Sequence, residues 1–289
     1  MSEKITEVLC YGEILFDVFD DQKLPGGAPF NVSAHLSQLG LSSTIISSVG
    51  NDTDGIELIK FAENKGVAIN FIQINEKYPT GTVLIQKDEN LDSIYTITEP
   101  VAWDFIKTSS SLIETVTNTP YFVFGSLATR SETSRNTLFE LLKHANTKIF
   151  DINLRTPHYD LDSIFEMMEI SNVVKMNEEE LNELSEKMGM AGLSLEEKLK
   201  KMAFDFNLEA LFVTRGGEGA CLYTRKNYYS NPGIKVEVVD TTGSGDSFLA
   251  VAIKLMKEKA SPDQILEKAC QMGSWVATQK GAIPLTRIM

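Results

Sequence analysis

Cysteine is scarce in this sequence, and its spacing carries no pattern. Cys10, Cys221 and Cys270 lie far apart among the 289 residues and form no CxxC pair. An odd number of cysteines without that spacing gives no support for a disulfide framework or a cysteine-based zinc site. We therefore expect three reduced thiols, most of them buried.

Positive charge is also in short supply. Lysine and arginine together number 27, against 40 aspartates and glutamates, which gives a net charge of −13. Nucleic acid is bound mainly through Lys and Arg, so this balance argues against nucleic acid, and against anionic membranes, as partners. An anionic ligand would have to be attracted locally, by a few basic residues, a helix N-terminus or a metal ion.

Long apolar runs are absent from the N-terminal stretch MSEKITEVLCYGEILFD, which carries Glu7 and Glu13. It resembles neither a signal peptide nor a membrane helix, so we expect a cytoplasmic enzyme. The three histidines show no metal-ligand spacing, and we expect structural or surface roles for them; they are His35, His144 and His158.

Short β-rich runs alternate with amphipathic segments along most of the chain. We expect strands at residues 8–16, 43–49, 121–124, 148–152, 173–176 and 211–214, and helices at 31–39 and 55–65. Such alternation predicts an α/β fold with a mostly parallel sheet covered by helices on both faces. No repeat or linker divides the chain, so we expect one domain over residues 1–289.

Residues 70–100 break this alternation. They read as two β-runs around a turn at Lys87–Asn90, with no helix between them. Such a pair fits poorly in a parallel sheet. We interpret residues 70–100, joined by about 13–26, as a small β lid beside an active site. A surface hairpin without a role is the alternative.

The stretch DTTGSGDS, residues 240–247, is the first candidate for chemistry. We expect a strand at 234–239 before it and a helix at 247–257 after it. Glycines allow close approach to a ligand, and the first helical turn offers free N–H groups to an anion. Asp246 would then accept a proton from an alcohol while this pocket holds a phosphoryl group. The alternative role for Asp246 is a helix N-cap.

Four further turns follow expected strands. PGGAPFN, residues 25–31, with Asp17 upstream, suits a ligand rich in hydroxyl groups, or is a plain helix start. In DINLR, residues 151–155, Arg155 could meet a phosphate. NEEE, residues 177–180, is also typical of an acidic first helical turn. TRGGEG, residues 214–219, is either a ligand-binding turn or a hairpin turn.

Together these motifs resemble the ribokinase-like, or PfkB, family of sugar kinases. DTTGSGDSF is similar to the family's C-terminal signature and PGGAPFNVSAHLSQLG to its N-terminal double-glycine signature. The motif order matches over essentially the whole chain. The resemblance implies a three-layer α/β/α sandwich with a mostly parallel sheet and a small β-sheet lid. It also implies ATP and Mg²⁺ as cofactors, with K⁺ in many members, and a homodimer formed through the lid.

The resemblance also implies roles for individual residues. Asp246 would be the general base, assisted by Arg155, and the backbone of Gly243, Ser244 and Gly245 would form the anion hole. The sugar would be held by Asp17, Gly26, Gly27, Ala28 and Asn31. The nucleotide would be bound by Asn177, Glu180, Thr214, Gly216, Gly219, Gly243 and Gly245, with Glu180 reaching Mg²⁺ through water. The monovalent cation would lie near Asp240, Thr242 and Gly281.

PGGAPFN with DINLR resembles the bacterial fructokinase branch, although Ile152 replaces the proline of that branch's DPNLR-like motif. We therefore expect phosphoryl transfer from ATP to fructose. A 2-keto-3-deoxygluconate kinase and a ribokinase are alternatives within the family. A catalytically silent sugar- or nucleotide-binding regulator is the alternative from another class. A dinucleotide-binding oxidoreductase would need a GxGxxG that Gly12-Glu13-Ile14 does not provide.

Overall fold

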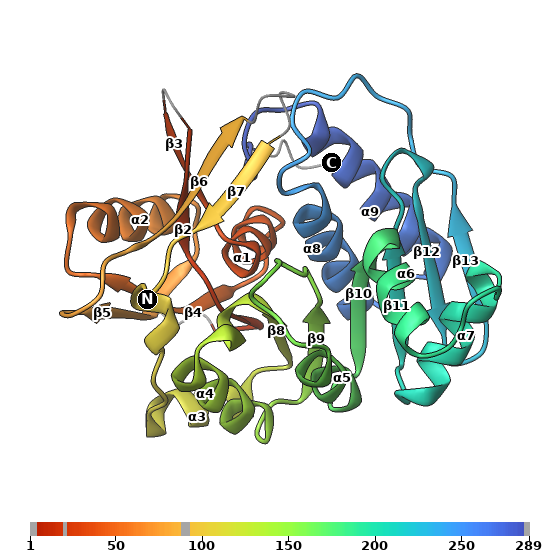
Figure 1. Cartoon of the computed structure of the whole chain (residues 1–289), viewed down its shortest axis with the longest axis horizontal. Coiled ribbons are helices and arrows are strands. Elements are labelled where there is room, and N and C mark those ends of the chain that lie inside the picture. The colour runs from red at the N-terminus through yellow and green to blue at the C-terminus, as the bar shows by residue number, and fades with distance from the viewer. Residues whose placement is uncertain (1–4, 20–21, 88–92, 286–289) are drawn as a thin grey trace.

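A nine-stranded sheet forms the centre of the computed structural model, which describes residues 5–19, 22–87 and 93–285 (Figure 1). The strand order is β13-β12-β11-β10-β9-β8-β1-β4-β5. The strands are β1 (Val8–Tyr11), β4 (Ser43–Gly50), β5 (Ala68–Asn75), β8 (Tyr121–Gly125), β9 (Thr147–Asp151), β10 (Val173–Asn177), β11 (Ala210–Thr214), β12 (Ala220–Thr224) and β13 (Tyr228–Asn231). Neighbours pair in parallel from β11 to β5, and β12 and β13 add antiparallel pairs at one edge. The prediction of a mostly parallel sheet is confirmed.

Helices cover both faces of this sheet. One face carries α1 (Ala28–Gln38), α2 (Thr53–Asn64), α8 (Ser244–Lys257) and α9 (Pro262–Ala277); the other carries α3 (Ser110–Asn118), α4 (Glu132–Leu142), α5 (Leu161–Glu169), α6 (Glu178–Lys187) and α7 (Leu195–Asp205). Because strand side chains alternate between faces, β1 contributes to two cores. Val8 and Cys10 pack on the α1 and α8 side, and Leu9 and Tyr11 on the α3 to α7 side. The three-layer prediction is therefore confirmed.

A second, four-stranded sheet stands beside α1 and α2 (Figure 1). It comprises β2 (Leu15–Val18), β3 (Lys23–Gly26), β6 (Gly81–Lys87) and β7 (Ser93–Ile97), in the order β3-β2-β6-β7. Lys23 ties it to α2 through ion pairs with Asp54 and Glu57. The predicted small sheet exists, but residues 70–75 belong to β5 of the large sheet. The turn expected at Lys87–Asn90 lies largely outside the described residues.

The single strand predicted for residues 8–16 is wrong, because two strands in different sheets share that stretch. The chain leaves the large sheet after Tyr11 and enters the small sheet at Leu15. Between them Gly12 has a φ of +142°, and a Cβ there would lie 2.7 Å from Pro29 Cγ. Glycine therefore allows the bend that sends one β-run into two sheets.

The strand predicted at residues 234–239 is also wrong. Val239 and Asp240 instead donate backbone N–H groups to the Ala277 carbonyl at the end of α9. The side chains of Ile234 and Val238 are 43% and 59% exposed. Alternating β-branched residues favour a strand only where a neighbouring strand and a core face are available, and this segment has neither.

The helices predicted at 31–39, 55–65 and 247–257 are present, but each begins earlier than expected. They start at Ala28, Thr53 and Ser244. The three cysteines are free and buried, as expected. Within the described ranges, no helix combines the length and apolar character needed to cross a membrane.

Candidate active site

The polar turns singled out in the sequence gather at one edge of the large sheet. Strands β1, β8, β9 and β10 run parallel, so the segments after their carboxyl ends share that edge, where ligands bind in α/β proteins. The Ser126 hydroxyl, after β8, donates to the Ile152 carbonyl, after β9, at 2.7 Å. This bond connects the exits of β8 and β9 directly.

The two glycine signatures meet at Asp246. Asn31 Nδ2, in the first turn of α1, donates to Asp246 Oδ2 at 2.8 Å, although the two residues are 215 positions apart. Burial raises the pKa of Asp246, and Lys175, Asn31 and Arg155 counteract that rise. Asp246 is the third residue of α8, whose N-cap is Gly243. The N-cap alternative for Asp246 is therefore wrong.

The first turn of α8 is shaped by Gly243. Its φ is +78°, and a Cβ there would lie 2.4 Å from the Ala282 carbonyl oxygen, so only glycine fits. The Ser244 N–H already donates to the Thr241 carbonyl at 3.1 Å. Within the described part of the chain, the N–H groups of Gly243 and Gly245 have no such partner. An anion hole in this conformation would therefore use those two groups rather than all three predicted ones.

The double glycine leaves room for the Asp17 carboxylate and for the Glu13 backbone. A Cβ on Gly26 would lie 2.6 Å from Asp17 Oδ2, and one on Gly27, whose φ is +110°, would lie 2.5 Å from the Glu13 carbonyl oxygen. Burial raises the pKa of Asp17 to about 6; Arg155 lowers it, and Asp240 and Asp246 raise it further. At pH 7 the charged form of Asp17 is thus favoured only modestly, and Asp246 is close enough to affect it.

Glu13 is a site residue that the sequence reasoning missed. It is 3% exposed, and its Oε1 accepts the backbone N–H of Ala28 at 3.1 Å. It thereby satisfies an N–H at the start of α1, where the Gly27 N-cap has no side chain to do so. Burial raises the pKa of Glu13 to about 7. The available signal was a lone charge inside the otherwise apolar run of residues 8–16.

Lys175 is the second missed residue. It lies in β10 and its Nζ donates to Asp151 Oδ1 at 2.9 Å, with both side chains almost fully buried. Arg155, in contrast, is exposed and donates to the Leu154 carbonyl. Its positive charge nevertheless lowers the pKa of Glu13, Asp17, Asp151 and Asp246. The cations that act on Asp151 and Asp246 are thus one buried lysine and one exposed arginine.

Asn177 and Glu180 form a capping box at the start of α6. Asn177 Oδ1 accepts the Glu180 N–H and Glu180 Oε2 accepts the Asn177 N–H, both at 2.8 Å. Glu180 Oε1 accepts the Leu154 N–H at 2.8 Å. Both carboxylate oxygens of Glu180 thus already accept backbone N–H groups. This arrangement fits an indirect contact with Mg²⁺ through water better than direct ligation. Within the described ranges, no group of three or more His, Cys, Asp or Glu side chains is arranged to hold a metal ion.

The residues predicted for a monovalent cation are close together. Asp240 accepts the N–H of Thr242 at 2.9 Å and that of Gly281 at 3.0 Å, so its carboxylate joins two loops. These N–H groups point at Asp240, which leaves backbone carbonyl oxygens of the loops as the suitable cation ligands. The role of these residues in K⁺ binding stays a prediction.

Thr214, Gly216 and Gly219 lie at the turn of the β11–β12 hairpin, so the hairpin reading of TRGGEG is correct. Thr214 pairs in register with Asn177, which brings the turn next to the capping box. A Cβ on Gly219 would lie 2.0 Å from the Asn231 carbonyl oxygen. Close packing against the segment after β13 therefore explains this glycine, and nucleotide binding by the turn stays a prediction.

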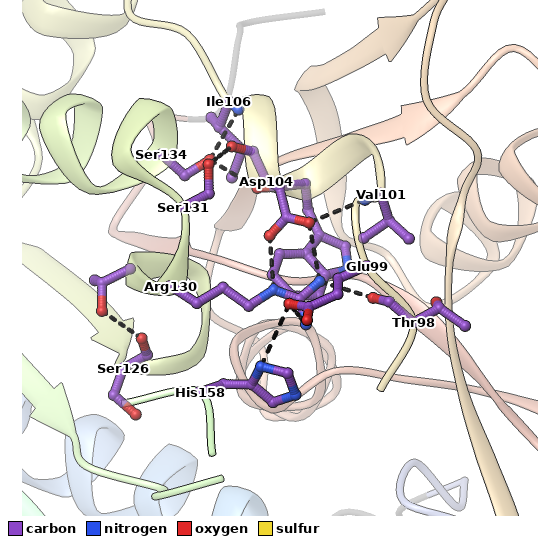
Figure 2. Close-up of polar contacts among 12 residues, drawn as sticks. Thr98, Glu99, Val101, Asp104, Ile106, Ser126, Arg130, Ser131, Ser134 and His158 are labelled. Atoms are coloured by element: carbon purple, nitrogen blue, oxygen red, sulfur yellow. Dashed lines mark hydrogen bonds and ion pairs between the residues drawn. The ribbon is translucent and has the colours of Figure 1, made fainter. Parts of the chain in front are cut away.

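A buried ion pair anchors the small sheet to this edge (Figure 2). Arg130 Nε and Nη2 donate to the two oxygens of Asp104 at 2.8 and 2.9 Å, and Nη2 also donates to the Thr98 carbonyl just after β7. His158 Nδ1 lies 3.5 Å from Glu99 Oε2. Because Arg130 follows β8, these contacts fasten the segment that leaves the small sheet after β7 to the carboxyl edge of the large sheet.

Comparisons with known proteins identify the family and the fold of this chain. The model of the family described as pfkB family carbohydrate kinase matches residues 2–288. The chain is 27% identical over 280 residues to a fructokinase of Escherichia coli, covering 90% of this chain and 87% of that protein. A fructokinase of Xylella fastidiosa solved with bound ATP superposes with a TM-score of 0.86 at 20% identity, covering 97% and 94% of the two chains. A Vibrio cholerae fructokinase, solved in its fructose, ADP and calcium ion bound form, gives a TM-score of 0.79 at 24% identity, covering 96% and 95%.

Proposed function

This chain belongs to the PfkB family of carbohydrate kinases, and from that premise we propose that it transfers the γ-phosphoryl group of ATP to a hydroxyl group of fructose. The observation that carries the proposal is the hydrogen bond between Asn31 and Asp246. This bond places Asp246, from the C-terminal glycine signature, beside the start of α1, which follows the N-terminal double glycine. That juxtaposition is what in-line transfer to a bound sugar requires.

Asp246 serves as the general base. Asn31 occupies its Oδ2, so Oδ1 is oriented to accept the proton of the attacking hydroxyl. The raised pKa of Asp246 makes it a stronger proton acceptor than an exposed carboxylate. Asp17, mainly in its charged form at pH 7, accepts hydrogen bonds from other hydroxyl groups of the sugar next to Gly26, Gly27 and Ala28.

The start of α8 and Arg155 provide the positive potential on the phosphoryl side. Free N–H groups and the helix dipole attract an anion, and Arg155 adds a charge from the β9 exit. Mg²⁺, when bound, neutralises phosphate charge, and Glu180 with Asn177 would order the water around it. Asp240, Thr242 and Gly281 would hold K⁺ behind this turn.

Two observations favour fructose over the family alternatives. The relative from E. coli is named a fructokinase. In addition, Asp240 and Asp246 raise the pKa of Asp17, so a further negative charge on an acceptor beside Asp17 is disfavoured. That repulsion argues against a sugar acid such as 2-keto-3-deoxygluconate.

ADP release measured across fructose, ribose, 2-keto-3-deoxygluconate, adenosine and fructose phosphates, with and without K⁺, tests the acceptor. For the mechanism, we expect Asp246→Asn to lower kcat by about 10²- to 10⁴-fold, with little change in ATP affinity or thermal stability. Asp263→Asn, in the exposed first turn of α9, is the matched control and should leave kcat unchanged.

Near wild-type kcat for Asp246→Asn would show that another group is the base. ADP release with another acceptor but not with fructose would overturn the substrate assignment. Calorimetric binding of a sugar without ADP release from any acceptor would identify a silent binding protein instead of a kinase.

A further inference from the structure

Lys175 occupies an unusual position for a lysine. It lies inside β10, on the face of the sheet that packs against α8, and is 6% exposed. Burying an ammonium group is costly unless it is paired. Its hydrogen-bond partner among the described residues is Asp151, which ends the adjacent strand β9. This pair requires an explanation beyond packing, because an apolar pair would fill the same space at less cost.

The ammonium group reaches the first turn of α8. A Cβ on Gly245 would lie 2.9 Å from Lys175 Nζ. Unlike Gly243, Gly245 has an ordinary negative-φ backbone, so its conformation does not require glycine. The missing side chain at Gly245 instead makes room for the charged end of Lys175. The two glycines of the signature therefore meet different physical demands.

Lys175 also stands among three buried acids. Burial lowers its pKa, but Asp151, Glu180 and Asp246 outweigh that effect and leave the pKa raised. Lys175 in turn lowers the pKa of each of the three. The other cation that acts on Asp151 and Asp246 is the exposed Arg155. Lys175 is thus the buried positive charge that acts on these three acids.

We propose that Lys175 is a positioning residue of the phosphoryl-transfer centre. It supports the first turn of α8 by packing against Gly245. It also places a positive charge behind the N–H groups that face the transferred phosphoryl group. The inference rests on the proposed function. Preorganised positive charge in a site that excludes water stabilises charge that develops in the transition state. Lys175 would act on that step more than on ground-state binding of sugar or ADP.

The competing explanation is that Lys175 only neutralises Asp151. Asp151 Oδ2 is buried and has no hydrogen-bond partner in the described part of the chain, so Lys175→Met alone should lower the melting temperature. The double variant Asp151→Asn/Lys175→Met removes both charges and separates the two explanations. Lys148→Met, at the opposite end of β9 from Asp151, is the matched control.

Two measurements on the full chain decide the matter. The first is steady-state ADP release with fructose, giving kcat and both KM values. The second is calorimetric titration with Mg²⁺-ADP, alone and with aluminium fluoride, which mimics the transferring phosphoryl group. For the double variant we expect a melting temperature close to wild type but a kcat lowered at least about tenfold. We also expect weaker binding of ADP with aluminium fluoride, by a similar factor, and unchanged binding of ADP alone.

Recovery of both kcat and aluminium fluoride binding in the double variant would overturn the inference and leave Lys175 as a structural partner of Asp151. If the wild-type chain releases no ADP with any sugar, the proposed function fails. The aluminium fluoride titration then still decides the role of Lys175: loss of binding in the double variant supports it, and unchanged binding refutes it.

Discussion

Replacing Glu13 with glutamine should change how the stability of this protein depends on pH. Glu13 is buried at the base of the sugar side of the site, and burial raises its pKa from 4.5 to about 7. The folded protein therefore holds a proton on Glu13 at pH values where the unfolded chain has lost it. Stability linked to this group is complete below pH 4.5 and is lost as the pH rises toward 7.

The size of the effect follows from the shift. One pKa unit corresponds to about 1.4 kcal/mol, so ionised Glu13 lowers the free energy of unfolding by about 3 kcal/mol at pH 8. At pH 5 the loss is below about 1 kcal/mol, because this pH lies only slightly above the pKa of 4.5 in the unfolded chain. Glutamine keeps an acceptor for the Ala28 N–H but adds an amide where Glu13 Oε2 has no partner, which costs about 1–3 kcal/mol at every pH.

The pH-independent cost cancels when two pH values are compared. Relative to wild type, the Glu13→Gln variant should therefore gain about 2–3 kcal/mol in unfolding free energy between pH 5 and pH 8. Urea unfolding followed by far-UV circular dichroism at pH 5, 6, 7 and 8 measures this difference. Glu186→Gln, at an exposed position of α6, is the control and should show no such gain. An equal offset at all four pH values would refute the buried, raised pKa of Glu13.

Two further predictions concern the sugar side and the small-sheet anchor. Asp17→Asn should raise the KM for sugar at pH 8 with the KM for ATP unchanged, and the difference from wild type should shrink below pH 6, where Asp17 itself becomes protonated; a KM ratio independent of pH would contradict this. Arg130→Met should lower the free energy of unfolding by about 3–5 kcal/mol because it leaves Asp104 buried without a counter-charge. Adding Asp104→Asn should restore part of that loss, and urea unfolding of the single and double variants checks both statements.

The sequence allowed the layers and the two glycine-rich helix starts to be predicted because both depend on local patterns. Apolar runs of strand length marked the large sheet, and glycines before helices marked the two turns that meet at Asn31 and Asp246. Parallel strands end at the same edge of a sheet, and this rule indicated that the two turns belong to one site. The prediction failed at residues 8–16 and 234–239, where the outcome depended on which neighbour was available rather than on the residues themselves.

Glu13 and Lys175 were missed for a related reason. Each is a single charge inside an apolar run, and local sequence does not distinguish a buried charge with a distant partner from an exposed one. The partners of Glu13 and Lys175, Ala28 and Asp151, are 15 and 24 positions away. Only the packing of α1 against β1, and of β9 against β10, shows that these charges belong to the site.

The charges at the site also explain how a chain with a net charge of −13 could accept a polyphosphate. Burial raises the pKa of Glu13 to about 7, so at neutral pH this acid carries only part of a full negative charge. Lys175 interacts with three buried acids at once. Arg155, on the exposed side, lowers the pKa of Asp17 and of other carboxylates at the site. The positive contributions at the start of α8 thus come from Lys175, Arg155 and the helix terminus, whatever the net charge of the whole protein. On this reasoning, removing Lys175 would weaken the site more than adding several acids to the distant surface, because exposed charges are screened within about 8–10 Å at physiological salt.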